Sequence, residues 1–436
     1  MALAIGLLLG IALMIFLAWK GWNVLILAPV AAIVIALTNH MPVAKAMLGS
    51  GKTYFGGLGG FLVSYMIIFL LGSLLGKYME DSKATITIAN SIFKLTGKND
   101  PYKVLLAIAL IGAALTYGGV TMFIFIFAVV ALGKPIFKEL NLPWRLVLLP
   151  MFFGGCTITM SVLPATPSIQ NVVPTALGTP LTSAPLVSLI ACVVVVAWGL
   201  WYMKWQLNKA VKAGEEYVEI GQEIKIDYKP EELPSLLASV LPLLVVVGII
   251  VYGSIVKMNN VAIIALLAGV IVSAALYWKY IPNQLATLNV GATNAVMPLI
   301  FTAAATGVGS VVTAAPGFTY LMNLMSGVPG GVMTQAVAVT AFLSCASGSA
   351  AGALGIIVPQ FGPQWIAAGA NPELLHRVMA ITSAAWSAMP HAGFVFSCIA
   401  VFGLKHKQVY KDMFALGFCG ANMALITVLA LAAIFY

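Results

Sequence analysis

The sequence predicts an all-α integral membrane protein built from two inverted repeats, each with five transmembrane helices and one re-entrant helical hairpin. Composition is the first reason: 61% of the 436 residues are hydrophobic and only 8% are charged, too few polar groups to cover a soluble core. The distribution of cations is the second. No lysine or arginine lies between Lys279 and Arg377, whereas the stretch from Lys77 to Arg145 holds eight. Because cytoplasmic loops collect basic residues, this contrast indicates two related halves in opposite orientations.

Apolar runs long enough to cross about 30 Å of hydrocarbon recur along the whole chain. In order, they predict spans at residues 3–19, 22–38, 58–79, 144–163 and 183–203, and then at 236–256, 261–278, 293–313, 375–399 and 413–435. No cleavable signal peptide is predicted, because the first apolar run starts at once without a basic flank. The predicted domains are the first repeat at 1–203, a cytoplasmic linker at 204–235 and the second repeat at 236–436.

Two further apolar stretches are interrupted midway by small residues. Residues 101–138 are interrupted at 116–119, and residues 329–362 at 344–349. Each arm has about 16 residues, which is short for a full crossing. Re-entrant hairpins that meet in the middle of the membrane therefore fit better than pairs of spans. The alternative is one kinked span plus a loop for each stretch.

Charge counting supports this arrangement. With the N-terminus outside, 18 basic residues fall in cytoplasmic loops and four fall outside. The four outside are Lys45, Lys52, Lys257 and Arg377. An odd number of crossings per half makes the second half begin on the opposite side, so the first hairpin opens to the cytoplasm and the second to the exterior. The linker holds seven of the 13 acidic residues among five lysines, and we expect a solvated connector.

Hairpin tips and proline breaks are the candidate binding sites, because each leaves backbone N–H and C=O groups without helical partners inside the membrane. Half-helix N-termini favour an anion, and half-helix C-termini favour a cation such as Na⁺. The predicted substrate-binding residues are Thr116, Tyr117, Gly118, Gly119, Thr121, Pro164, Thr166, Ser168, Asn171, Ser347, Gly348, Ser349, Pro390 and His391. The predicted coupling-ion residues are Gly118, Thr166, Ser347 and His391. For any single hydroxyl, a hydrogen bond back to its own helix is the competing interpretation.

Titratable residues limit the chemistry. All 13 acidic residues fall at span ends or in loops, with Asp412 near a membrane surface, which argues against a carboxylate proton relay and against a divalent-metal transporter. His391 follows Pro390 directly and is suited to carry a coupling proton or to donate to a substrate carboxylate. A neutral histidine bonded to a backbone carbonyl is the alternative. His376 and His406 are expected near the surfaces, in contact with water.

Other functional classes find no support in the sequence. It contains no Walker-type phosphate loop, HExxH or GxSxG, and glycine-rich runs such as 55–61 lack the strand context of a nucleotide site. We therefore predict no enzyme and no cofactor, apart from H⁺ or Na⁺ as the coupling ion. The cations do not cluster among aromatic residues, so no nucleic acid partner is expected. The five cysteines have unrelated spacings that imply neither a disulfide framework nor a metal site.

The order of these features resembles a known group. A cytoplasmic hairpin carries TYGG at its tip and an external hairpin carries ASGSA, and the proline breaks read LPATP at 163–167 and MPHAG at 389–393. This pattern resembles the ion transporter superfamily and, within it, the gluconate permease (GntP-type) family. The family's proline-rich break falls on 163–168, where Pro164 and Pro167 match and Thr166 replaces the family histidine. Its second break falls near 390–394, where Gly393 and Phe394 match but the aspartate is missing.

The resemblance implies a homodimer in the bilayer of a bacterial plasma membrane, with static scaffold domains and mobile transport domains that move by an elevator mechanism. It also implies a small organic anion as substrate, such as gluconate, another hydroxy acid or a related monocarboxylate, taken up together with a cation. Two alternatives stay open. A cation/proton antiporter would need no organic substrate, although the missing intramembrane carboxylate counts against it. A membrane subunit of an ion-pumping decarboxylase complex would be revealed by partner subunits that co-purify.

Overall fold

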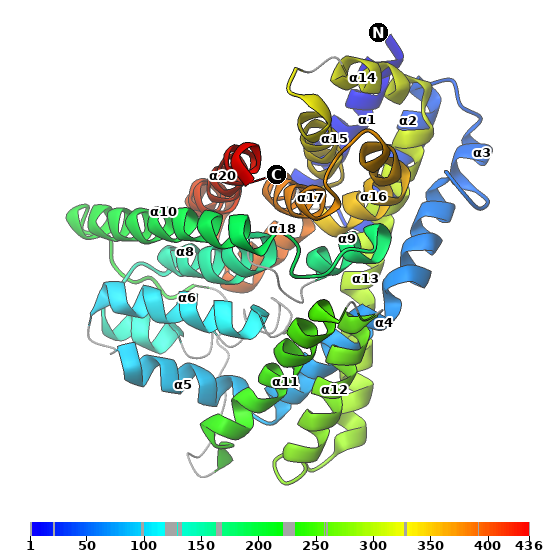
Figure 1. The fold of residues 1–436 in the computed structure, drawn as a ribbon. Helices are drawn as coiled ribbons and strands as arrows, with labels where there is room; N and C mark the ends of the chain where they lie inside the picture. The colour runs from blue at the N-terminus through cyan, green and yellow to red at the C-terminus, as the bar shows by residue number, and fades with distance from the viewer. Residues whose placement is uncertain are drawn as a thin grey trace.

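The chain is almost entirely helical (Figure 1). The structure, a computed structural model, describes residues 2–20, 22–96, 100–117, 129, 133–162, 168–220, 232–256, 258, 260–326, 329–390 and 392–435. Within these residues, helices are joined by turns and no strand occurs. The predicted all-α class is therefore confirmed.

Two groups of three helices form one side of the molecule. The first group is α1 (Ala2–Trp19), α2 (Val24–Thr38) and α4 (Tyr54–Asp81), with the short α3 (Val43–Met47) before α4. The second group is α11 (Leu236–Ile255), α12 (Val261–Leu276) and α13 (Gln284–Ala314). Polar caps fix where the two long helices start: the side chain of Thr53 accepts from the N–H of Gly56, and Asn283 accepts from Ala286.

The two long helices α4 and α13 run antiparallel and in close contact along their length. A Cβ on Gly307 would lie 2.7 Å from the Tyr54 carbonyl oxygen. Near the other end of the pair, the Ser73 hydroxyl donates to the Gly291 carbonyl at 2.7 Å. Because glycine has no side-chain heavy atom, the two helix backbones can approach closely at these positions. Around this pair, α2 packs on α13 while α12 packs on α4.

The remaining elements include the interrupted helices. In the first half these are α5 (Ala84–Thr96), α6 (Pro101–Tyr117), a helical segment at 133–139, η1 (Trp144–Val147), α8 (Leu148–Pro150), the π-helical η2 (Met151–Val162), α9 (Ser168–Leu177) and α10 (Pro185–Lys212). In the second half they are α14 (Pro316–Ser326), α15 (Gly331–Ser347), α16 (Ala350–Ala367), α17 (Pro372–Ser387), α18 (Gly393–Phe402), α19 (His406–Met413), η4 (Phe414–Cys419) and α20 (Gly420–Phe435).

Helices coincide with all the predicted spans, but two of them are longer than predicted. Helix α10 continues to Lys212, nine residues into the predicted linker, and α13 begins nine residues before 293. Hydropathy marks the width of the apolar layer, whereas a helix ends where its backbone is capped. In α10 the end is set by Gly214, whose φ of +65° suits a left-handed residue after the helix.

Length and surface composition fit a membrane. The described residues contain five helices that are long and apolar enough to span one: α4, residues 236–253 of α11, α10, α13 and the continuous 406–435. Large apolar side chains lie exposed on their outer faces; Val63 is 88% exposed, Val193 69% and Leu237 72%. Such an apolar exterior is stable against lipid rather than water.

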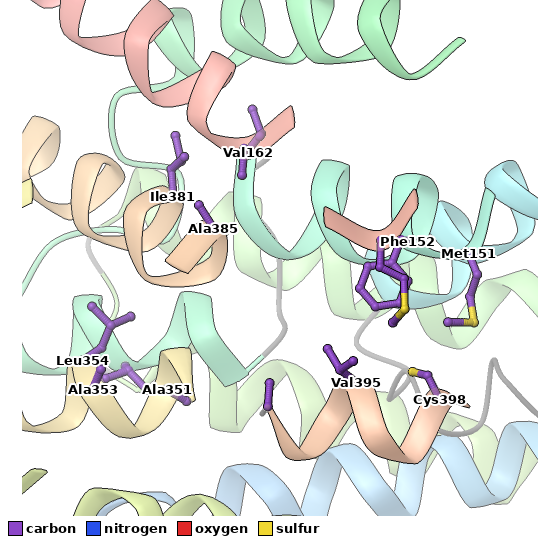
Figure 2. Close-up of a cluster of buried hydrophobic side chains, with 14 of the residues drawn as sticks. Met151, Phe152, Val162, Ala351, Ala353, Leu354, Ile381, Ala385, Val395 and Cys398 are labelled. Carbon is purple, nitrogen blue, oxygen red and sulfur yellow. The ribbon is translucent and has the colours of Figure 1, made fainter. Parts of the chain in front are cut away.

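The two interrupted regions share one core. Figure 2 shows Val395 and Cys398 of α18 directed toward Met151 and Phe152 of η2. The rings of Phe152 and Phe394 have centroids 5.7 Å apart. The last helix of the broken span in the second half is thereby packed against the broken span of the first half.

Candidate functional site

The second hairpin turns within two residues. Helix α15 ends at Ser347, Gly348 adopts a φ of +60°, and Ser349 caps α16 by accepting from the Gly352 N–H at 3.2 Å. A left-handed φ costs glycine little, so the small-residue cluster of the sequence marks the turn itself. The C-terminus of one helix and the N-terminus of the next therefore meet at Gly348 and Ser349.

The second broken span is interrupted between α17 and α18, at residues 388–392. Side chains of α19 hold this break: the Tyr410 hydroxyl donates to the Ala388 carbonyl at 3.1 Å, and His406 Nε2 lies 3.1 Å from the Pro390 carbonyl oxygen. His406 was expected in water, but it is half-buried against the break. Sequence reasoning missed Tyr410 and His406 because they lie in a later helix. His391 is outside the described residues.

The turn and the break of the second half lie close together. Helix α15 packs on α17 along its length. Helix α16 connects them and packs on both, so α15 and α17 run in the same direction. The two helices therefore end side by side, and their C-terminal carbonyl ends combine partial negative charge at one place.

Three buried hydroxyls lie in α15 and α17, and of these only Ser344 belongs to the predicted hairpin tip at 344–349. Thr340 and Ser344 are one turn apart on α15, and Thr382 is on α17. All three are fully buried, and their hydroxyl oxygens have no hydrogen-bond partner in the described structure. An unpaired buried hydroxyl costs roughly 1–3 kcal/mol. A ligand, ion or water that used these oxygens would remove that cost.

In the first half, the candidate Thr116 is already hydrogen-bonded. Its hydroxyl lies 2.6 Å from that of Thr159 in η2 and donates to the Gly112 carbonyl. Both threonines are buried. For Thr116 the bond back to its own helix is therefore confirmed. Tyr117 is the last residue of α6 and is half-buried.

The remaining candidates of the first half fall mostly outside the described residues. This holds for Gly118, Gly119 and Thr121 of the hairpin tip and for Pro164 and Thr166 of the break. Helix α9 starts directly after that break, with Ser168 as its first residue and Asn171 one turn later.

Two basic residues expected near the outer surface are buried in α17. His376 is fully buried with Nδ1 2.8 Å from the Thr179 hydroxyl, and Arg377 is fully buried and donates to the carbonyls of Leu181 and Ser183. The prediction of a solvated His376 was wrong, and the burial of Arg377, which was counted on the outer side, was not predicted. Residues 178–184 fold over this end of α17. The burial therefore depends on a distant segment and could not be predicted from the sequence of α17 alone.

Asp412 is another charged residue that the structure buries. It is 3% exposed, although it was expected near a membrane surface. Its carboxylate accepts from Tyr202 at 2.9 Å, from Gln206, and from the Arg145 guanidinium at 3.3 Å. The carboxylate is thus satisfied within a network that joins α10 and η1 to α19. Such a network fixes helices in place.

The fold and the interrupted helices define a multi-pass membrane transporter, and the comparisons agree. A model of the GntP family permeases matches residues 1–434. The uncharacterized transporter YxjC of Bacillus subtilis is 31% identical over 450 residues, covering 94% of each chain. The high-affinity gluconate transporter of Escherichia coli is 32% identical over 179 residues, 40% of this chain and 36% of that one. The chain belongs to the GntP family of permeases and is not an enzyme.

A solved structure supports the fold independently. The crystal structure of the Alcanivorax borkumensis YdaH transporter superposes with a TM-score of 0.54 and covers 87% of both chains. Sequence identity to it is 14%, so this likeness concerns the fold alone.

Proposed function

We propose that this permease is a cation-coupled symporter of a small organic anion, a hydroxy acid or another monocarboxylate. The observation that carries the proposal is the pairing of the α15–α16 turn with the α17–α18 break among apolar helices. Main-chain groups at such interruptions are available to a ligand. The partial match to a gluconate transporter supports a carboxylate as cargo.

The proposed anion ligands are the tip and break residues predicted from the sequence. Helices α9, α16 and α18 each begin at one of these interruptions, near Ser168, Ala350 and Gly393. Helix N-termini present N–H groups and partial positive charge, which suits a carboxylate without a full buried cation. Hydroxyls such as that of Ser349 would bond to the hydroxyl groups of the cargo.

We place the proposed coupling ion, H⁺ or Na⁺, at helix C-terminal ends, opposite the N-terminal ends proposed for the anion. The adjoining C-terminal ends of α15 and α17 favour a cation. The unpaired hydroxyls of Thr340, Ser344 and Thr382 supply neutral oxygen ligands of the type that Na⁺ uses, in the same two helices. This arrangement supports Na⁺ more directly than H⁺, because no carboxylate is among the groups.

Inverted repeats and an elevator movement are part of the proposal. Reciprocal packing of α2 on α13 and of α12 on α4 supports two related halves. The six helices α1, α2, α4, α11, α12 and α13 would form the scaffold, and the hairpins and broken spans would form the mobile part. Small residues of α16 face the scaffold closely: a Cβ on Gly352 would lie 3.0 Å from the Thr306 hydroxyl, and one on Gly355 3.2 Å from the Phe61 ring. Because no side chain protrudes at these glycines, the mobile part could slide along the scaffold at this contact.

Uptake into proteoliposomes tests the function. Labelled gluconate, other hydroxy acids and simple monocarboxylates are offered under a Na⁺ gradient and, separately, a proton gradient. At least one carboxylate should accumulate under one gradient and not without it. Failure of every carboxylate under both gradients would refute symport. Cation exchange without any carboxylate would instead favour the antiporter, and stoichiometric co-purifying subunits would favour the decarboxylase complex.

Two variants test the cation ligands. Thr340→Val and Thr382→Val keep side-chain shape but remove a hydroxyl, and each should raise the half-saturating Na⁺ concentration about tenfold, the effect of losing one ligand worth about 1.4 kcal/mol. Thr427→Val is the matched control, because that hydroxyl only bonds to the Met423 carbonyl of its own helix. Equal Na⁺ dependence in all three variants would place the cation elsewhere.

A cross-link tests the movement. Cysteines introduced together as Thr306→Cys and Gly352→Cys in a cysteine-free background should form a disulfide that stops uptake, and reduction should restore uptake. Uptake that continues at full rate with the disulfide formed would rule out sliding at this contact. The proposed homodimer is checked by light scattering of the purified protein, where a monomer mass would contradict it.

A further inference from the structure

The first residues of the linker are docked onto the cytoplasmic hairpin. We call residues 213–220, which follow α10 directly, the strap. Glu215 forms a two-point ion pair with the Arg145 guanidinium, with contacts of 2.7 and 2.8 Å. The Tyr217 N–H donates to the Asn141 side chain at 3.0 Å, and Glu219 pairs with the Lys134 ammonium at 3.1 Å. The linker was expected to be a solvated connector; the strap is largely exposed, as expected, but it is also bound to neighbouring elements, which the sequence did not predict.

These contacts satisfy cations that would otherwise be poorly solvated. Lys134 is 6% exposed and lies in the helical segment 133–139, the second arm of the predicted hairpin. Its ammonium is 5.8 Å from the centre of the Trp144 ring. A buried ammonium needs a counter-charge, and Glu219 provides one that lies 85 residues away in sequence. The Lys138 ammonium, at 3.7 Å, adds a second cation to Glu219.

Arg145 connects the strap to the buried network. Its guanidinium binds Glu215 on one side and Asp412 on the other. Asp412 in turn accepts from Tyr202 and Gln206 of α10. The hairpin arm, the start of the broken span and α10 are therefore joined through charges that the strap completes. At its far end, the linker is attached separately to α5, where Glu232 pairs with Lys83 at 2.6 Å.

We propose that the strap is a releasable restraint, which holds the second arm of the cytoplasmic hairpin against α10 and slows its opening. The proposal rests on the hairpin being the inner gate of the proposed transporter. Release frees the arm, because Lys134 then loses its counter-charge Glu219, and Arg145 keeps only Asp412.

The chemistry of the contact points to ionic strength as the releasing signal. Arg145 holds the pKa of Glu215 below its usual value, and Lys134 does the same for Glu219. Both carboxylates thus stay charged at every pH above about 4.5, the ordinary glutamate value, so a drop from pH 7 to 6 leaves the strap docked. Salt screens exposed ion pairs, and Glu219 has a 55% exposed side chain.

Hydrogen exchange of the full chain in lipid nanodiscs tests the restraint. Amides in 133–147 should exchange about tenfold faster in the Glu215→Gln, Glu219→Gln double variant than in the wild type. Raising salt from 0.05 to about 0.5 M should speed exchange in the wild type and have little further effect in the double variant. Glu216→Gln is the matched control, because Glu216 is exposed in the same strap; it should behave as the wild type.

Equal exchange in 133–147 for the wild type and the double variant would overturn the restraint, and so would equal acceleration by Glu216→Gln. The rate of transport is a separate measurement of the same restraint. In proteoliposomes, the double variant should take up labelled gluconate several times faster than the wild type at saturation, with unchanged half-saturation. If the wild type takes up no gluconate, the choice of cargo fails, while the exchange measurement still decides the strap.

Discussion

Gly154→Ala tests a very close contact between two helices. Gly154 lies in η2, opposite Ala109 of α6, and a Cβ at this position would overlap the Ala109 carbonyl oxygen and lie 2.6 Å from its carbonyl carbon. The obstructing atoms belong to the backbone, so no rotamer change can relieve the clash. The helices α6 and η2 must then move apart by roughly 1.5 Å to reach an ordinary contact distance of about 3.5–4 Å.

The expected loss of stability follows from this displacement. Overpacking of a tight interior typically costs about 1–3 kcal/mol, and the upper half of that range applies because backbone must shift. Separation also lengthens the hydrogen bond between the Thr116 and Thr159 hydroxyls, which now measures 2.6 Å. We expect a fall in unfolding temperature of about 2–3 °C. Thermal unfolding in detergent, followed by labelling of the five free cysteines with a thiol-reactive dye, measures it.

Gly248→Ala is the matched control for this prediction. Gly248 lies in helix α11, and its Cβ would meet nothing within 4 Å. Alanine should be neutral or stabilising there by up to about 1 kcal/mol, since it favours the helix. If Gly154→Ala unfolds at the same temperature as Gly248→Ala, the α6–η2 contact is looser than described and the reasoning fails.

Three further outcomes follow from buried contacts. Arg377→Met should lower the free energy of unfolding by about 2 kcal/mol, because two buried carbonyls lose their donor; unchanged thermal unfolding would contradict this. Thr116→Val and Thr159→Val should be non-additive by about 1 kcal/mol in a double-mutant cycle of unfolding, and strict additivity would exclude a direct hydrogen bond. Stability contributed by Glu215 should be complete above pH 4.5, since its pKa is lowered in the folded state, and should be lost progressively as pH falls from that value through the lowered pKa. Unfolding of the wild type and Glu215→Gln between pH 7 and 3 measures it, and a stability difference that does not shrink as the pH falls would refute the ion pair.

Much of the fold could be read from local patterns. Apolar runs predicted each span, and the small residues around Gly348 and the proline at 390 predicted the turn and the break of the second half. These features are local: a turn needs a residue with positive φ, and a proline lacks the N–H that a helix requires. The family resemblance, drawn from the same motifs, is confirmed by the match over residues 1–434.

The sequence alone determined that this chain lies in a membrane, where its helices fall and where two of them are interrupted, because lipid selects for apolar length and caps act within a few residues. Only the tertiary structure decided which polar groups are buried. Arg377, His376 and Asp412 sit near the ends of apolar runs, where local sequence predicts water. They are covered by residues about two hundred positions away, such as Leu181, Thr179 and Tyr202. Burial depends on what packs against a residue, and distant chain segments supply that packing.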